Sequence, residues 1–158
     1  MKPDRKFPVH HSPHEPQYGK SVIIFLTVCS KEKISIFASK QAQDKLISSW
    51  EQAKGWTVGY YCLMPDHIHL FCSPYAGYPT SLKDWVKYWK SIFTRQWKMN
   101  VSIKQSIWQK DFWDTQLRSN ESYSAKWQYV TQNPVRAGLV GHSHDWPYQG
   151  ELNILEFS

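Results

Sequence analysis

Hydrophobic and polar residues follow the periods of strands and helices along most of the chain. Segments 21–30, 56–64 and 67–72 are dense in β-branched and aromatic residues, a composition that is typical of strands. Pro65 and Asp66 stand between the second and third segments and favour a tight turn. The sequence therefore predicts three strands, of which the last two form a hairpin.

Three other segments, 41–54, 81–99 and 121–133, have apolar residues at helical spacing. The middle segment has the clearest pattern, because at about 100° per residue its apolar side chains share one arc and its lysines lie opposite. Segment 108–117 is predicted to hold a fourth strand. The order β-α-β-β-α-β-α predicts an α+β fold, a ferredoxin/RRM-like antiparallel sheet with helices packed on one face.

The two ends of the chain lack such a pattern. Residues 1–20 hold four of the nine prolines and three histidines, which predicts a flexible Pro/His-containing arm. Residues 141–158 are mixed in character and are predicted to form a C-terminal tail. The folded domain is therefore expected to span residues 21–140.

Composition narrows the class of protein. The 158 residues carry 19 Lys and Arg against 13 Asp and Glu, and 16% of them are aromatic, which favours a polyanionic partner. No apolar run reaches the roughly 18–20 residues that cross a bilayer, and no secretory signal follows Met1, so no membrane partner is expected. The three cysteines form no CxxC pair and are typical of buried thiols in a reducing compartment, which predicts a cytoplasmic protein.

His67 and His69 are the first candidates for a chemical role. Two residues apart on a strand, they point to the same face, and in a ferredoxin-like sheet their strand lies centrally. Paired imidazoles on one face are a natural platform for a metal ion. A pair of polar residues on a solvent-facing surface is the alternative interpretation.

Tyr129 and Asn133 are the second pair of candidates. Tyr123, Trp127 and Val130 form the buried stripe of the predicted helix 121–133, and Tyr129 lies about 160° from Trp127. Asn133 follows Tyr129 by four residues, so it is predicted to share the same non-core face one turn along. An exposed tyrosine beside a helix-terminating asparagine would give the same pattern.

Longer motifs carry a resemblance to a known family. Segment 64–70 (MPDHIHL) resembles the HUH motif of single-tyrosine transposases. Segment 129–140 (YVTQNPVRAGLV) resembles the tyrosine helix of the REP-associated tyrosine transposases, and the likeness continues through 108–113 (WQKDFW) and 117–118. The two main motifs stand about 60 residues apart in the family's order, and the resemblance covers most of residues 21–140.

The resemblance implies an enzyme that cleaves and rejoins single-stranded or hairpin DNA. In that family's terms Tyr129 would be the nucleophile, and a 5′-phosphotyrosine would conserve the energy of the phosphodiester for strand transfer. His67 and His69 would be metal ligands, Asn133 matches the third ligand, and Gln132 is the fallback. The implied ion is Mg²⁺, for which Mn²⁺ can substitute.

The excess positive charge is concentrated in one stretch. Seven basic residues and one acidic residue occupy positions 83–110, between the two motifs, and we expect them to contact the DNA backbone. Arg118 and Arg136 are weaker candidates for the same role. The seven are Lys83, Lys87, Lys90, Arg95, Lys98, Lys104 and Lys110.

Two other functions are compatible with the same residues. One is an RRM-like module that binds nucleic acid without cleaving it. The other is a metallohydrolase that uses the His67–His69 pair to activate water. Both a monomer and a homodimer are compatible with the sequence. A covalent bond between Tyr129 and DNA would distinguish strand transfer from both alternatives.

Overall fold

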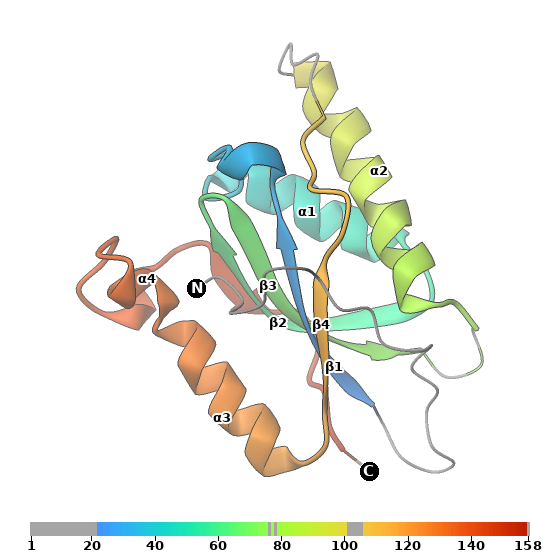
Figure 1. Cartoon of the computed structure of the whole chain (residues 1–158), viewed down its shortest axis with the longest axis vertical. Helices are drawn as coiled ribbons and strands as arrows, with labels where there is room; N and C mark the ends of the chain where they lie inside the picture. Colours follow the sequence, from blue (N-terminus) through green and yellow to red (C-terminus); the bar gives the residue numbers. More distant parts are fainter. Residues whose placement is uncertain (1–21, 76, 78, 101–105, 158) are drawn as a thin grey trace.

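The computed structural model describes residues 22–75, 77, 79–100 and 106–157, and these form one five-stranded antiparallel sheet with helices (Figure 1). The strand order is β4-β1-β3-β2-β5. The strands are β1 (Ile23–Cys29), β2 (Trp56–Met64), β3 (His67–Pro74), β4 (Trp113–Leu117) and β5 (Gln149–Glu151). The helices are α1 (Lys40–Gln52), α2 (Leu82–Asn100), α3 (Asn120–Thr131) and the single turn α4 (Asn133–Arg136), with 3₁₀ turns at Lys31–Lys33 and Ser143–Asp145.

The predicted α+β class with a ferredoxin/RRM-like sheet is confirmed. β2 and β3 form the predicted hairpin, in which Met64 pairs directly with His67 across the Pro65–Asp66 turn. β3 also pairs with β1, so it is the middle strand of the five. The histidine strand is therefore fixed on both edges by backbone hydrogen bonds.

One face of the sheet is covered by α1 and α2. The apolar arc of α2 points into this core, together with alternate residues of β1, β2 and β3, because side chains alternate between the faces of a strand. The indole rings of Trp85 and Trp89 lie 6.1 Å apart within this layer. All seven residues of the predicted arc are buried, namely Leu82, Trp85, Val86, Trp89, Ile92, Phe93 and Trp97.

The opposite face is covered by α3, whereas the sequence predicted helices on one face only (Figure 1). The Tyr123 ring lies 5.1 Å from that of Phe71, and the Trp127 ring stacks 4.8 Å from that of Tyr60. These side chains form a second apolar layer with Ile23, Phe25 and Val130. The inward stripe of α3 is the one predicted, but it packs on the face opposite to α1 and α2.

The C-terminal residues form part of the packed domain, so the structure contradicts their assignment as a tail from residue 141. β5 pairs with β2 along Tyr60–Cys62, and the Trp146 indole donates to the carbonyl of Leu63 at 3.0 Å. Leu155 is buried against Gly59, where a side chain on the glycine would place its Cβ within 2.7 Å of the leucine side chain. The domain therefore extends to at least Leu155.

The proposed arm at residues 1–20 lies outside the described residues. Among the helices that the structure describes, we find none with the length and apolarity needed to cross a membrane.

Candidate active site

His67 and His69 lie side by side on β3, on the face of the sheet that α3 covers. Their ring centroids are 4.7 Å apart, and the two side chains are 6% and 1% exposed. The pair is therefore not a set of solvated surface residues. Backbone alternation placed both rings on one face, as predicted, while Ile68 between them is fully buried in the opposite layer.

Each histidine is oriented through its Nδ1 atom. Thr27 on β1 has its Oγ1 2.9 Å from Nδ1 of His69, and a carboxylate oxygen of Asp66 lies 2.7 Å from Nδ1 of His67. An ionised carboxylate only accepts hydrogen bonds, so it fixes the proton of His67 on Nδ1. With Nδ1 held in this way, Nε2 is the nitrogen through which each ring would bind a metal ion. Asp66 thus does more than form a turn.

Tyr129 is exposed near the end of α3, as its position in the helix predicts. Its side chain is 41% exposed, and two cations lie beside its ring. The Arg136 guanidinium carbon is 4.0 Å from the ring centroid and the Lys126 ammonium nitrogen is 5.7 Å from it. A cation over an aromatic face is attracted by the ring quadrupole, so these two residues favour this position of the ring.

A short series of contacts joins Tyr129 to the histidine pair. The ammonium of Lys126 also lies 5.3 Å from the ring centroid of Phe25. The ring of His69 stacks on the same Phe25 ring, with centroids 5.3 Å apart. The structure therefore brings the tyrosine helix and the histidine strand to the same region of one face.

Asn133 differs from its predicted position. The backbone leaves α3 at Gln132 and restarts at α4, so Asn133 does not continue the helical face of Tyr129. Its side chain is 2% exposed, and its Oδ1 accepts a hydrogen bond from Arg136 at 2.7 Å. Gln132, the fallback ligand, is exposed. The prediction that Asn133 lies on a non-core face is therefore wrong.

Comparisons with known proteins identify the family of this chain. Residues 20–132 match the model of a family described as "Transposase IS200 like". The chain belongs to this family. It is therefore a transposase of the enzyme class expected from its HUH and tyrosine motifs, and the resemblance to REP-associated tyrosine transposases is confirmed by its relatives.

Two relatives of this transposase cover most of its length. A REP-associated tyrosine transposase of Escherichia coli is 25% identical over 139 residues, which cover 87% of this chain and 81% of the relative. A Haemophilus influenzae protein assigned to the same group is 27% identical over 154 residues, covering 87% and 84%. A solved REP-associated transposase bound to a REP hairpin has the same fold, with a TM-score of 0.68, 22% identity and coverage of 88% and 82%.

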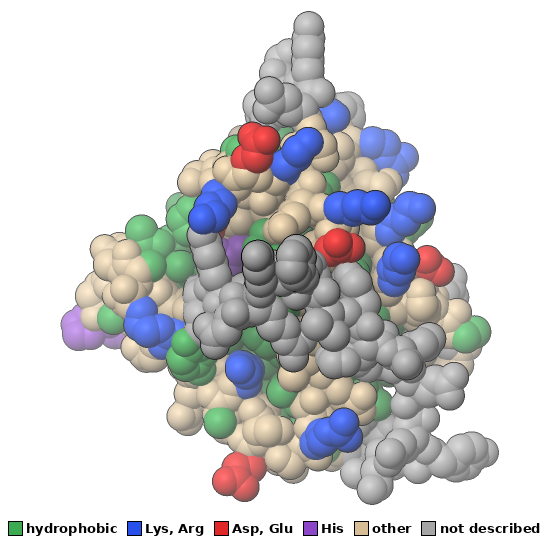
Figure 2. Space-filling view, in the orientation of Figure 1, with side chains coloured by type: hydrophobic (Ala, Val, Ile, Leu, Met, Phe, Trp, Pro, Cys, Tyr) green, Lys and Arg blue, Asp and Glu red, His purple; other side chains and the backbone are tan. Residues whose placement is uncertain are grey.

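The basic residues of the transposase gather on and beside α2, where Figure 2 shows lysine and arginine side chains over the upper right of the molecule. Lys104 lies outside the described residues. Lys90 is buried at 9% exposure, which contradicts its predicted place on the surface. The remaining predicted contacts are exposed, namely Lys83, Lys87, Arg95, Lys98, Lys110, Arg118 and Arg136.

Lys90 is enclosed because the chain folds back over α2 after residue 106. Its ammonium donates to the carbonyl of Gln109 at 3.2 Å and lies 5.7 Å from the ring of Trp108. Burial lowers the pKa of this ammonium from 10.5 to about 8, although the nearby Asp111 carboxylate acts in the opposite direction. The sequence placed Lys90 among the exposed lysines because it lies on their side of the helix.

Lys90→Met is expected to raise the free energy of unfolding at pH 7 by up to about 3 kcal/mol, since a charged group with a lowered pKa destabilises the folded state. Between pH 8 and pH 10.5 Lys90 holds its proton in the unfolded chain and loses it in the folded one. The contribution of this residue to wild-type stability therefore rises with pH through this window, and the advantage of the variant shrinks. Urea unfolding at pH 7 and pH 10 measures both effects, and an advantage that grows with pH contradicts the assignment.

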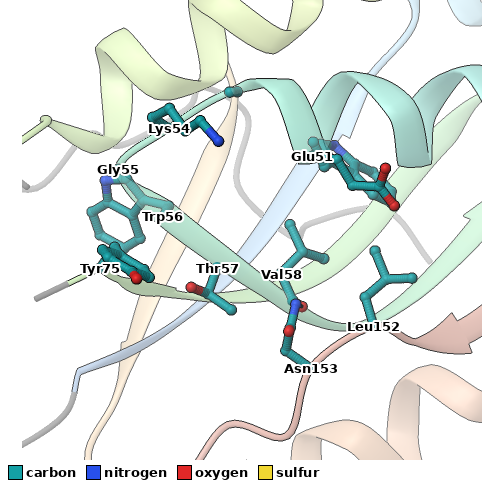
Figure 3. Close-up of a pocket in the computed structure, with 11 residues that line it drawn as sticks. Glu51, Lys54, Gly55, Trp56, Thr57, Val58, Tyr75, Leu152 and Asn153 are labelled. Carbon is teal, nitrogen blue, oxygen red and sulfur yellow. The ribbon is translucent and has the colours of Figure 1, made fainter.

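A cavity of about 470 Å³ lies at the other end of the β2–β3 hairpin (Figure 3). Tyr75 and Trp56 stand together at one side of it, and Leu152 and Asn153 line the other. Asn153 donates to the carbonyl of Val58 at 2.9 Å and so covers part of the β2 edge. Because the histidine pair is at the opposite end of β3, this cavity is separate from the candidate active site.

Proposed function

We propose that this transposase cleaves and rejoins single-stranded or hairpin DNA through a 5′-phosphotyrosine on Tyr129. The observation that supports this most directly is the pairing of an exposed tyrosine with an oriented, buried histidine pair on one face of the sheet. The proposed substrate follows from the likeness to a solved relative that is bound to a REP hairpin.

Bond making and bond breaking balance at the scissile phosphate. The phenol oxygen of Tyr129 loses its proton and forms a bond to phosphorus, while the bond from phosphorus to the 3′ oxygen breaks and that oxygen takes up a proton. The phosphodiester energy is kept in the tyrosine ester, so a 3′-OH can reverse the step without ATP. The exposed position of Tyr129 leaves its hydroxyl accessible to a DNA strand.

His67 and His69 are the residues that would hold a divalent ion, Mg²⁺ or Mn²⁺. They fit this role because a carboxylate and a hydroxyl orient their Nδ1 atoms, as outer partners do for metal-binding histidines. Asn133 would complete the set through Oδ1 if Arg136 released it, and Gln132 remains the fallback. When bound, such an ion supplies Lewis-acid stabilisation of the charge that develops on the phosphate.

Arg136 is a positioning residue for Tyr129 in this proposal. Its guanidinium lies over the tyrosine ring and also donates to the tyrosine's own carbonyl oxygen at 2.7 Å. The same cation is exposed and has the fork of donors that binds phosphate oxygens. It can therefore hold the ring and attract the backbone of the DNA strand next to it.

The direct test is the covalent adduct. Purified protein incubated with a hairpin oligonucleotide and Mg²⁺ or Mn²⁺ should give a protein–DNA species that survives denaturing electrophoresis and disappears after chelation of the ion. Protease digestion and mass spectrometry should place the nucleotide on Tyr129. Binding without an adduct would favour the non-cleaving module, and cleavage without an adduct would favour a hydrolase.

Thr27→Val should weaken metal binding about tenfold or more, because it removes the oxygen that orients Nδ1 of His69 while keeping the shape of the side chain. The measurement is the Mn²⁺ concentration that gives half-maximal adduct. Thr57→Val on β2, which lies at the distant cavity, is the matched control and should leave that concentration unchanged. An equal response of the two variants would show that Thr27 does not act through the histidine.

A further inference from the structure

A groove of about 650 Å³ runs between α2 and the chain segment that leads into β4. Its rim carries four exposed cations, and its floor contains the buried side chains of Val86, Lys90 and Phe112 with the half-buried Trp108. Asp111 is the one carboxylate among the lining residues. The four rim cations are Lys83, Lys87, Arg95 and Lys110.

The groove has the size and composition of a ligand site. Its volume falls within the range of about 300–1,000 Å³ that is typical of binding clefts, which are mostly apolar with a few polar groups. The rim residues Lys83 and Arg95 are 12 positions apart on α2, which corresponds to about 18 Å along a helix axis. A row of cations of this length above an apolar floor complements a short run of phosphates with attached bases.

The groove lies close to the candidate active site. Gln109, whose carbonyl accepts from Lys90, donates its own backbone N–H to the carbonyl of Cys29 at 3.1 Å. Cys29 in turn is directly opposite His67 in the β1–β3 register. Two strand spacings, about 10 Å, therefore separate the backbone at Gln109 from that of His67. The histidine side chains point to the α3 face, whereas the groove lies on the α2 side. A strand of DNA held in the groove would therefore pass round this end of the sheet to reach the histidine pair.

We propose that the groove between α2 and residues 107–112 binds the single-stranded DNA that flanks the hairpin, with phosphates on the rim cations and an unpaired base against the apolar floor. This rests on the proposed function only in naming DNA as the polyanion. An acidic protein segment would satisfy the same charges, but the nearness of the groove to His67 in a DNA transposase favours the nucleic acid.

The test compares two double variants with the same change of charge. Lys83→Glu with Lys87→Glu reverses the rim, and Lys40→Glu with Lys54→Glu reverses two exposed lysines at the ends of α1. A fluorescent oligothymidylate of about 12 nucleotides serves as the probe in anisotropy titrations. The rim variant should bind at least about tenfold more weakly, and the slope of log K against log salt should fall by about 1.4 because two phosphate contacts are lost. The α1 variant should match wild type.

Equal affinities of the rim variant and wild type for the oligonucleotide would overturn the proposal, as would an equal loss in the α1 variant. Unchanged DNA affinity with loss of binding to a glutamate-rich peptide would assign the groove to an acidic partner instead. Thermal unfolding of both variants verifies the fold.

Assays of the covalent adduct show whether a failure concerns the groove or the strand-transfer mechanism. The rim variant should lose the gain in adduct formation that a single-stranded flank gives to wild type. If wild type forms no adduct with any hairpin, the strand-transfer mechanism fails while the oligothymidylate result still decides the role of the groove.

Discussion

Tyr129→Phe is expected to abolish the covalent protein–DNA adduct and to lower strand cleavage by about 10³-fold or more, because the variant has no nucleophilic oxygen. Hairpin binding should stay within about twofold of wild type. Arg136 and Lys126 pack against the ring, which the variant keeps, and the side chain is exposed, so no buried group loses a partner. Gel shift and denaturing electrophoresis on the same samples measure the two effects separately.

Tyr75→Phe is the matched control for this experiment. Tyr75 is also exposed, at 63%, but it lies at the cavity on the far end of the hairpin. Its variant should form the adduct at the wild-type rate. Cleavage that survives Tyr129→Phe, or is lost equally in both variants, would rule out Tyr129 as the nucleophile.

His67→Ala should reduce metal-dependent cleavage by about 10²-fold or more, since one of two imidazole ligands is lost and the ion no longer meets the phosphate in a fixed position. The fold should survive, because His67 lies at the very start of β3 and its partner Asp66 is accessible to water. Adduct formation across a Mn²⁺ titration, with thermal unfolding in parallel, measures both properties.

A second His-x-His pair in the same chain supplies the control. His142 and His144 have ring centroids 5.5 Å apart, yet both are exposed on the turn after α4. His142→Ala should leave the metal requirement unchanged. A normal Mn²⁺ dependence in His67→Ala, or a loss in His142→Ala, would mean that the ion is held elsewhere.

Most of the architecture could be predicted because its signals are local. The stripe of α2 and the Pro65–Asp66 hairpin follow from periodicity and turn chemistry within short windows. β5 could not be predicted, since Gln149, Gly150 and Glu151 have no apolar pattern and pair with β2 through backbone groups. The packing of α3 on the second face likewise depends on contacts between distant segments.

In the candidate active site, too, local features could be predicted and contacts between distant segments could not. Strand alternation predicted that His67 and His69 share a face, whereas the contact between Thr27 and His69 joins residues 42 positions apart and depends on the register of β1 with β3. Helical periodicity failed for Asn133 because a break at Gln132 intervenes. It failed for Lys90 because another segment covers that side of the helix.

Arg136 couples the positions of Tyr129 and Asn133 across the junction between α3 and α4. One guanidinium nitrogen bonds both the carbonyl of Tyr129 and the amide oxygen of Asn133, and the same guanidinium lies over the tyrosine ring. The hydroxyl-bearing ring and the amide therefore cannot be repositioned independently while this linkage holds. An anion that competes for the guanidinium would weaken its contacts with Tyr129 and with Asn133 at the same time. The positions of the tyrosine ring and the asparagine amide are therefore coupled to the binding of one anion.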